Sequence, residues 1–128
     1  MFILDTCTLI WLILQQEELS NKAKSSIHRH AGSLFVSSMS AFEITMHANK
    51  KVLILPSPPL EWFNEALLRH GLIEIPVDAN IASSSVQLPP IHKDPIDRII
   101  IATAARQKLN VLTPDKHMHA YSQAKCIW

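Results

Sequence analysis

The chain has 128 residues, 48% of them apolar, which predicts one folded domain over residues 1–128 and excludes a disordered protein. A net charge of +1 excludes a strongly basic body, so any grip on nucleic acid would need a local patch or metal ions. Cys7 and Cys126 are too few for a disulfide framework. Without a leader-like segment or an apolar run long enough for a bilayer, we expect a soluble, cytoplasmic protein with no membrane partner.

Short apolar runs alternate along the chain with segments of helical pattern. The runs predict strands at residues 2–4, 34–37, 72–77 and 110–113, with an edge strand at 125–127. The helices predicted between them cover residues 9–14 behind hydroxyl caps at 6–8, then 20–30, a helix from Ser38 or Ser40 to about Asn49, and 60–70, 78–86 and 94–105. This alternation predicts a three-layer α/β/α fold around a mostly parallel sheet.

A buried helix is predicted to begin at Asp94. Pro95 suits the first turn, where its missing N–H has no partner, and Asp94 occupies the N-cap position. Asp97 shares a face of that turn with Asp94. For two isolated acids, a cap and a favourable helix dipole are sufficient explanation. A chemical role therefore depends on other acids reaching this helix start.

Three further acids are predicted at the same edge of the sheet. Asp5 follows the first strand, Asp115 follows the fourth, and Glu43 lies near the start of the helix after the second strand. Ligands bind at this edge in open α/β sheets. Clustered carboxylates raise one another's pKa, and an all-oxygen ligand set suits Mg²⁺ or Mn²⁺ better than Zn²⁺. Two structural alternatives exist for Glu43: a capping box with Ser40 and a surface pair with His47.

In this order and spacing the motifs resemble those of PIN-domain ribonucleases, specifically the small VapC-type toxins of bacterial toxin–antitoxin pairs, over essentially the whole chain. The matching segments are Leu4-Asp5-Thr6, Glu43, His92–Arg98, Asp97–Ala104 and Thr113-Pro114-Asp115. The resemblance implies a catalytic, Mg²⁺- or Mn²⁺-binding site of four acids with two supporting hydroxyls. These residues are Asp5, Glu43, Asp97 and Asp115, supported by Thr6 and Thr113.

The same resemblance implies an endoribonuclease that hydrolyses RNA by in-line attack of an activated water, leaving a 5′-phosphate and a 3′-hydroxyl. It also implies a small DNA-binding antitoxin and a second copy of the chain as partners. The apolar segments Trp11–Leu14 and Trp62-Phe63 provide further support for a homodimer, because they offer more apolar surface than a small domain needs.

Three further residues lie near the predicted site, and each has a structural alternative. Asp94 is a supporting acid for which a helix cap is favoured over a ligand. Lys93 and Arg98 are candidates to bind RNA phosphates, although solvated helix ends are the simpler alternative. Because Arg98 lies at a helix start, where the dipole disfavours a cation, we expect it to pair with an acid or a phosphate. It should then matter for substrate more than for folding.

Other classes of protein fit the sequence less well. A haloacid-dehalogenase-type phosphatase needs a second Asp two residues after the first, where this chain has Cys7, which we interpret as a small apolar residue and not a nucleophile. A receiver-type signalling domain needs an acid at the end of a middle strand, and this chain has Val36-Ser37 and Ile75-Pro76 at those places. A catalytically inactive PIN-like binding or scaffold module stays open, although the presence of all four acids argues against it.

Overall fold

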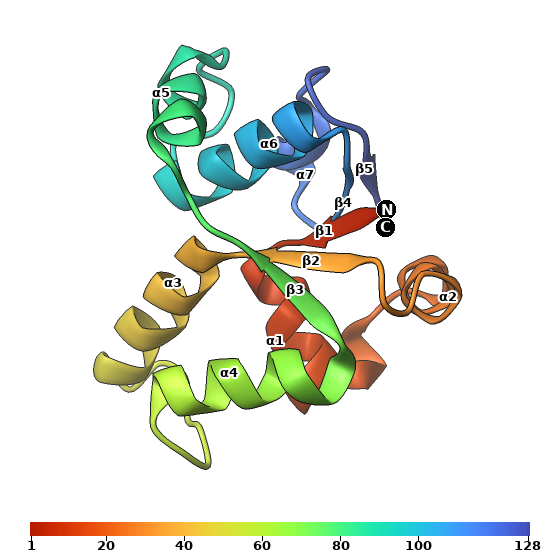
Figure 1. The fold of residues 1–128 in the computed structure, drawn as a ribbon, viewed down its shortest axis with the longest axis vertical. Helices are drawn as coiled ribbons and strands as arrows, with labels where there is room; N and C mark the ends of the chain where they lie inside the picture. Colours follow the sequence, from red (N-terminus) through yellow and green to blue (C-terminus); the bar gives the residue numbers. More distant parts are fainter.

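A five-stranded, entirely parallel sheet runs through the middle of the computed structural model, which describes residues 1–128 (Figure 1). Its strand order is β3-β2-β1-β4-β5. The strands are β1 (Phe2–Leu4), β2 (Leu34–Ser37), β3 (Leu72–Ile75), β4 (Asn110–Leu112) and β5 (Cys126–Ile127). The central strand, β1, is buried throughout, as expected for a parallel strand with helices on both faces.

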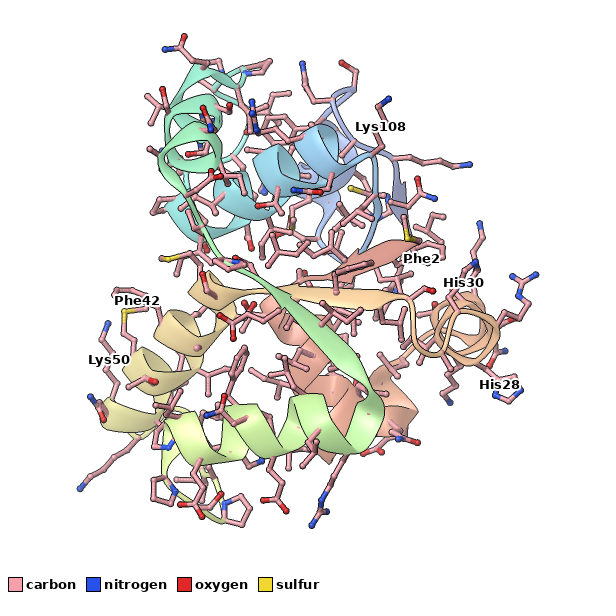
Figure 2. The ribbon with its side chains drawn as sticks, viewed as in Figure 1. Phe2, His28, His30, Phe42, Lys50 and Lys108 are labelled. Carbon is pink, nitrogen blue, oxygen red and sulfur yellow. The ribbon has the colours of Figure 1, made fainter.

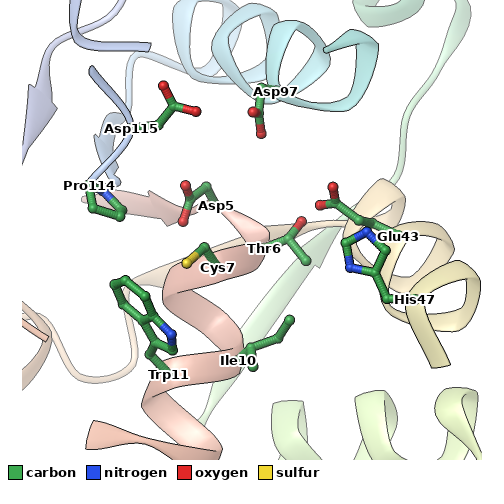
Figure 3. A pocket seen from close by; sticks show the side chains of 10 residues that line it. All are labelled: Asp5, Thr6, Cys7, Ile10, Trp11, Glu43, His47, Asp97, Pro114 and Asp115. Carbon is green, nitrogen blue, oxygen red and sulfur yellow. The ribbon is translucent and has the colours of Figure 1, made fainter. Parts of the chain in front are cut away.

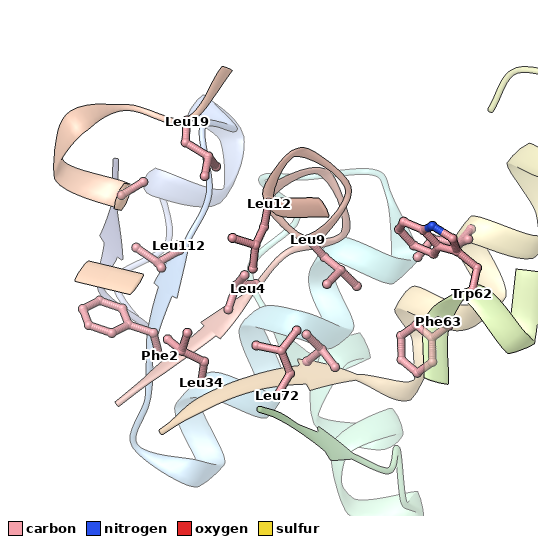
Figure 4. Packing of buried hydrophobic residues seen from close by; sticks show 13 residues of the cluster. Phe2, Leu4, Leu9, Leu12, Leu19, Leu34, Trp62, Phe63, Leu72 and Leu112 are labelled. Atoms are coloured by element: carbon pink, nitrogen blue, oxygen red, sulfur yellow. The ribbon is translucent and has the colours of Figure 1, made fainter. Parts of the chain in front are cut away.

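Helices cover both faces of the sheet. They are α1 (Thr6–Leu14), α2 (Asn21–Arg29), α3 (Ser38–Asn49), α4 (Pro59–His70), α5 (Ala79–Gln87), α6 (Pro95–Gln107) and α7 (Lys116–His119), with a 3-10 turn, η1 (Gln16–Glu18). Side chains of α1 to α4 pack on one face (Figure 4), and those of α6 and α7 pack on the other. This confirms the three-layer α/β/α fold. None of the helices is both long enough and apolar enough to span a bilayer.

The alternation of side chains along β1 divides the core into two clusters. Phe2 and Leu4 join the cluster beneath α1 and α4, whereas Ile3 joins the cluster beneath α6. All three are almost completely buried, and each stabilises the fold by roughly 1.5–3 kcal/mol relative to an exposed side chain. The end of β1 is therefore fixed from both sides, immediately before Asp5.

Capping residues determine where the helices begin. Asp5 caps α1 by accepting a 2.8 Å hydrogen bond from the N–H of Thr8, and Asp94 caps α6 as predicted. The predicted cap of α3 was wrong, because Ser37, the last residue of β2, accepts from the N–H of Met39. The strand thus passes directly into the helix, and its last side chain satisfies a free N–H.

The buried face of α4 also differs from the prediction. The helical pattern of residues 60–70 predicts that Leu60, Phe63, Leu67 and Leu68 point inward. Phe63 is buried as predicted (Figure 4). Leu60 and Leu68 are instead 62% and 84% exposed, and Trp62 is buried in their place. The helix is rotated because the large aromatic pair buries more apolar area than the leucines would. Trp62-Phe63 therefore cannot supply a dimer surface.

Arg98, in the first turn of α6, holds the segment that joins α5 to α6. One terminal nitrogen donates to the carbonyls of Pro89 and His92 and to the hydroxyl of Tyr121. The other lies within hydrogen-bond distance of the carbonyls of Ser85, Val86 and Leu88. The guanidinium thus satisfies carbonyls at the C-terminal end of α5, where the helix dipole favours a cation.

These contacts correct the expected role of Arg98. It forms no ion pair with an acid and does not line the acid pocket described below. The dipole of its own helix disfavours the charge, as predicted, but its side chain is long enough to reach the end of another helix. The structure therefore gives Arg98 structural contacts with the end of α5, and its contact with substrate stays a prediction.

Replacing Arg98 with Ala should destabilise the fold, because several carbonyls lose their hydrogen-bond donor. We expect a loss of about 3 kcal/mol, a fall in Tm of roughly 10 °C, measured by a thermal melt. Arg106→Ala, at an exposed position on the same helix, is the control and should change stability by less than about 0.5 kcal/mol. Equal melting temperatures for Arg98→Ala and Arg106→Ala would contradict the structural role.

Candidate active site

A pocket of about 430 Å³ lies at the carboxyl edge of the sheet, between the start of α1, the middle of α3 and the start of α6 (Figure 3). All four acids singled out in the sequence line it. The full lining is Asp5, Thr6, Cys7, Ile10, Trp11, Glu43, His47, Asp97, Pro114 and Asp115. Four segments that are far apart in the sequence therefore bring their carboxylates to one cavity.

Asp5 is the most deeply buried of the four acids. Its side chain is 3% exposed, and its two oxygens accept hydrogen bonds from the N–H of Thr8 and, at 2.5 Å, from the hydroxyl of Thr113. Burial raises the pKa of Asp5, and the Asp115 charge raises it further, against the effect of these two hydrogen bonds. No cationic side chain pairs with Asp5.

Thr113 connects Asp5 to Asp115. Its hydroxyl donates to Asp5 and accepts, at 3.0 Å, from the N–H of Asp115. Asp115 in turn caps α7, because its Oδ1 accepts from the N–H groups of His117 and Met118. Burial raises the pKa of Asp115, but a hydrogen bond from His92 and these two backbone donors together lower it below its ordinary value. The expectation that every acid of the cluster has a raised pKa was therefore wrong for Asp115.

Asp97 projects into the pocket from the first turn of α6. Burial, with the nearby charges of Asp94, Asp5 and Glu43, raises the pKa of Asp97 to about 7. Asp94 acts as the helix cap, because its Oδ1 accepts from the N–H of Ile96 at 2.9 Å. Asp94 thus accepts a backbone hydrogen bond at the start of the helix, whereas Asp97 faces the cavity.

Glu43 reaches the pocket from α3 and has neither of the structural partners considered for it. The helix begins at Ser37, which places Glu43 six residues beyond the cap, too far for a capping box. No ion pair or hydrogen bond joins it to His47 or to any other side chain. Its carboxylate points toward Asp97 and Asp5 (Figure 3).

Thr6, the other predicted hydroxyl, bonds to Ser40 at 3.0 Å and so joins the start of α1 to α3. Lys93 is exposed in the turn before α6 and does not line the pocket. Cys7 lines the pocket, but burial and the surrounding acids raise its pKa to about 12. Its thiol is protonated at neutral pH, which agrees with the expectation that it is no nucleophile.

His92 is a site residue that sequence reasoning missed. Its Nε2 lies 2.9 Å from Oδ2 of Asp97 and 3.0 Å from Oδ2 of Asp115, and its Nδ1 accepts from the N–H of Asp94 at 3.2 Å. Because a backbone N–H can only donate, Nδ1 carries no proton and Nε2 does. The available signal was its position at the start of the His92–Arg98 motif, in which the acids, Lys93 and Arg98 had predicted roles but His92 had none.

His117 lies beside this group on the outer side. Ligand atoms of His92, Asp115 and His117 all come within 4.8 Å of one another, a spacing that a metal ion could use. However, His92 presents a protonated nitrogen to Asp115, and a ligating imidazole nitrogen must be unprotonated. In this arrangement His92 is a hydrogen-bond donor, and the three residues are not a ready metal site.

Comparisons with known proteins were made on the sequence and on the fold. The PIN domain family model matches residues 2–123. Ribonuclease VapC22 of Mycobacterium tuberculosis is 28% identical over 129 residues, covering 98% of this chain and 97% of the relative. DNA-bound VapBC from Salmonella typhimurium has a TM-score of 0.74 at 20% identity, covering 98% of this chain and 96% of its own. A toxin–antitoxin complex from Klebsiella pneumoniae has a TM-score of 0.70 at 22% identity, covering 100% and 97%. With the family model matching nearly the whole chain, this protein belongs to the PIN-domain family.

Proposed function

We propose that this protein is a cytoplasmic endoribonuclease that uses Mg²⁺ or Mn²⁺, and that it is the toxin of a toxin–antitoxin pair. The observation that carries the proposal is the convergence of Asp5, Glu43, Asp97 and Asp115 on one pocket without a Lys or Arg partner. The relative named as a VapC ribonuclease supports RNA as the substrate. Structural neighbours that are toxin–antitoxin complexes support an antitoxin as a partner.

The donor groups of the pocket fit a hard divalent cation. Carboxylate and hydroxyl oxygens dominate its polar lining, and the single thiol is held protonated. A buried carboxylate such as Asp5, with no cation beside it, destabilises the fold unless a positive charge arrives. We assign the four acids as the residues that would hold the ion, with Thr6 and Thr113 orienting the elements that carry them.

When bound, a divalent cation in such a site activates water and offsets the negative charge of a phosphodiester. The protein's own side chains would position the carboxylates for this reaction. Thr113 fixes Asp5 relative to Asp115, and the first turn of α6 directs Asp97 into the pocket. Glu43 has no hydrogen-bond or ion-pair partner, so its carboxylate is available to the ion and to the water that the ion activates. In-line attack would leave a 5′-phosphate and a 3′-hydroxyl, and exposed Lys93 is a candidate contact for RNA phosphates.

The apolar surface proposed for protein partners is not the surface first expected. Trp62 and Phe63 are buried, whereas Phe42 on α3 (Figure 2) and Leu60 on α4 are more than half exposed. Both line a groove between α3 and α4. Val52 and Ile54, in the connection between these helices, are also exposed. We propose that surfaces of this kind bind the antitoxin and a second copy of the chain.

Cleavage of RNA should require the cation. Purified protein incubated with total RNA should cleave it with Mg²⁺ or Mn²⁺ and should lose this activity in EDTA. Glu43→Gln, which keeps the shape of the side chain, should lower the rate by about 100-fold or more. Equal cleavage with and without EDTA would exclude the metal mechanism. No cleavage of any RNA by protein with bound metal would favour the inactive binding module.

Acidification should stabilise the metal-free protein. Asp97 has a folded pKa of about 7 against an ordinary 3.8, so the folded state binds a proton that the unfolded chain does not. Protonation of Asp97 therefore stabilises the fold at low pH, and this stabilisation is lost as pH rises toward 7. The lowered pKa of Asp115 acts in the opposite direction, but only below about pH 4.

The measurement is a thermal melt in EDTA at pH 8 and pH 5.5. When the pH falls from 8 to 5.5, the free energy of unfolding of the wild type should rise by on the order of 1 kcal/mol more than that of Asp97→Asn. This corresponds to a difference of roughly 4 °C in the change of Tm. The variant serves as the control because it keeps every histidine. Parallel pH dependences in the two proteins would show that Asp97 is not the responsible group.

Asp5→Asn should separate folding from metal binding. Asn caps helices as well as Asp does, and the change removes a buried charge, so the metal-free protein should gain about 1 kcal/mol. At a free Mn²⁺ concentration of 100 times the dissociation constant, the free energy of unfolding of the wild type should rise by ~2.7 kcal/mol, and that of the variant by far less. Thermal melts with EDTA and with Mn²⁺ measure both effects. A variant that is less stable in EDTA and shifts normally with Mn²⁺ would make Asp5 a purely structural cap.

A further inference from the structure

We propose that His92 is a positioning residue that holds Asp97 and Asp115 in the geometry needed for a divalent cation, as a hydrogen-bond donor and not as a ligand. This inference rests on the proposed function of the pocket. Asp97 lies on α6 and Asp115 follows β4, so no backbone hydrogen bond links them. The Nε2–H group of His92 donates to Oδ2 of Asp115 at 3.0 Å, and the same nitrogen lies 2.9 Å from Oδ2 of Asp97, so one imidazole contacts both carboxylates.

The contacts leave each carboxylate little freedom to rotate. In Asp115, Oδ2 faces His92 while Oδ1 accepts from the start of α7. In Asp97, Oδ2 faces His92, and Oδ1 has no protein partner. The His92 side chain is 13% exposed, so water competes only weakly for its hydrogen bond to Asp115 and its contact with Asp97. One shared donor thus aligns two acids from separate elements.

A backbone hydrogen bond on the opposite side of the ring fixes the tautomer of His92. The N–H of Asp94 donates to Nδ1, and a proton there would place two donors against each other. Binding of a metal by Nε2 would require that unfavourable tautomer. The ring is therefore set to donate toward the acids, which distinguishes a positioning residue from a ligand.

The backbone of His92 is held as firmly as its ring. Its N–H donates to the hydroxyl of Tyr121 at 2.9 Å, and its carbonyl accepts from Arg98. Tyr121 and Arg98 also share the carbonyl of Pro89. A connected set of hydrogen bonds therefore runs from the end of α5 through His92 to Asp115, and His92 also contacts Asp97. Outer partners of this kind typically change metal affinity by 10–100-fold when they are removed.

The test is the Mn²⁺ affinity of metal-free protein, measured by EPR titration. His92→Phe keeps a ring but has no donor and should weaken binding by about tenfold or more. His92→Gln can place an amide N–H near the Nε2 position and should restore affinity to within about threefold. His92→Asn is a shorter amide that cannot reach both acids and should behave like the Phe variant. It replaces that variant if His92→Phe does not fold.

His117→Gln is the matched control, because it removes the neighbouring imidazole but not the shared donor. Its Mn²⁺ affinity should equal that of the wild type. Pulsed EPR of Mn²⁺ bound to the wild type should show no coordinated imidazole nitrogen. Such a signal, or a donor-free variant that binds Mn²⁺ as tightly as the wild type, would overturn the inference. A wild type that binds no Mn²⁺ at all would instead overturn the proposed function.

Discussion

The hydrogen bond from Thr113 to Asp5 joins the ends of β1 and β4, and the arrangement of the pocket depends on it. Leu4 and Leu112 pair in parallel, and the N–H of Asp5 donates to the carbonyl of Leu112, so the ladder continues one step beyond the strands. Thr8 adds a second bond to the same carbonyl. The last residues of the sheet are thereby also the first residues of the pocket, and the rigidity of the core extends to the carboxylates.

Rigidity of this kind allows charges to stay close that would otherwise separate. The raised pKa values of Asp5 and Asp97 show that both carboxylates are held where ionisation is unfavourable. The surrounding elements cannot relax, because Ile3 and Ile101 are completely buried and fix β1 and α6 against each other. Stability of the core is used here to maintain an electrostatically unfavourable site, which is a common condition of active sites.

The parts of this structure that the sequence predicted well are those set by local rules. The cap at Asp94, the proline in the first turn of α6 and the short buried strands all depend on neighbouring residues only. The common edge of the four acids then follows from the parallel sheet. The lowered pKa of Asp115 was missed, because it depends first on a hydrogen bond from His92, 23 residues away, and then on backbone donors from a helix that the sequence barely indicates.

The features that sequence reasoning missed depend on side chains reaching across the fold. Arg98 contacts carbonyls up to 13 residues away, at the end of a different helix. His92 reaches Asp115, 23 residues further along the chain. The inward face of α4 was decided by whether leucines or aromatic residues fill the space beside β2 and β3, a competition that periodicity alone does not resolve.

Two acids of the pocket also begin helices, and this double use shapes how the chain could diverge. Asp5 starts α1 and Asp115 starts α7, whereas Glu43 caps nothing. Asn and Ser serve as helix caps nearly as well as Asp, but Ala does not. In a descendant that had lost the chemistry, folding alone would still select for Asn or Ser at positions 5 and 115. Position 43 would be free to drift to almost any helix-forming residue.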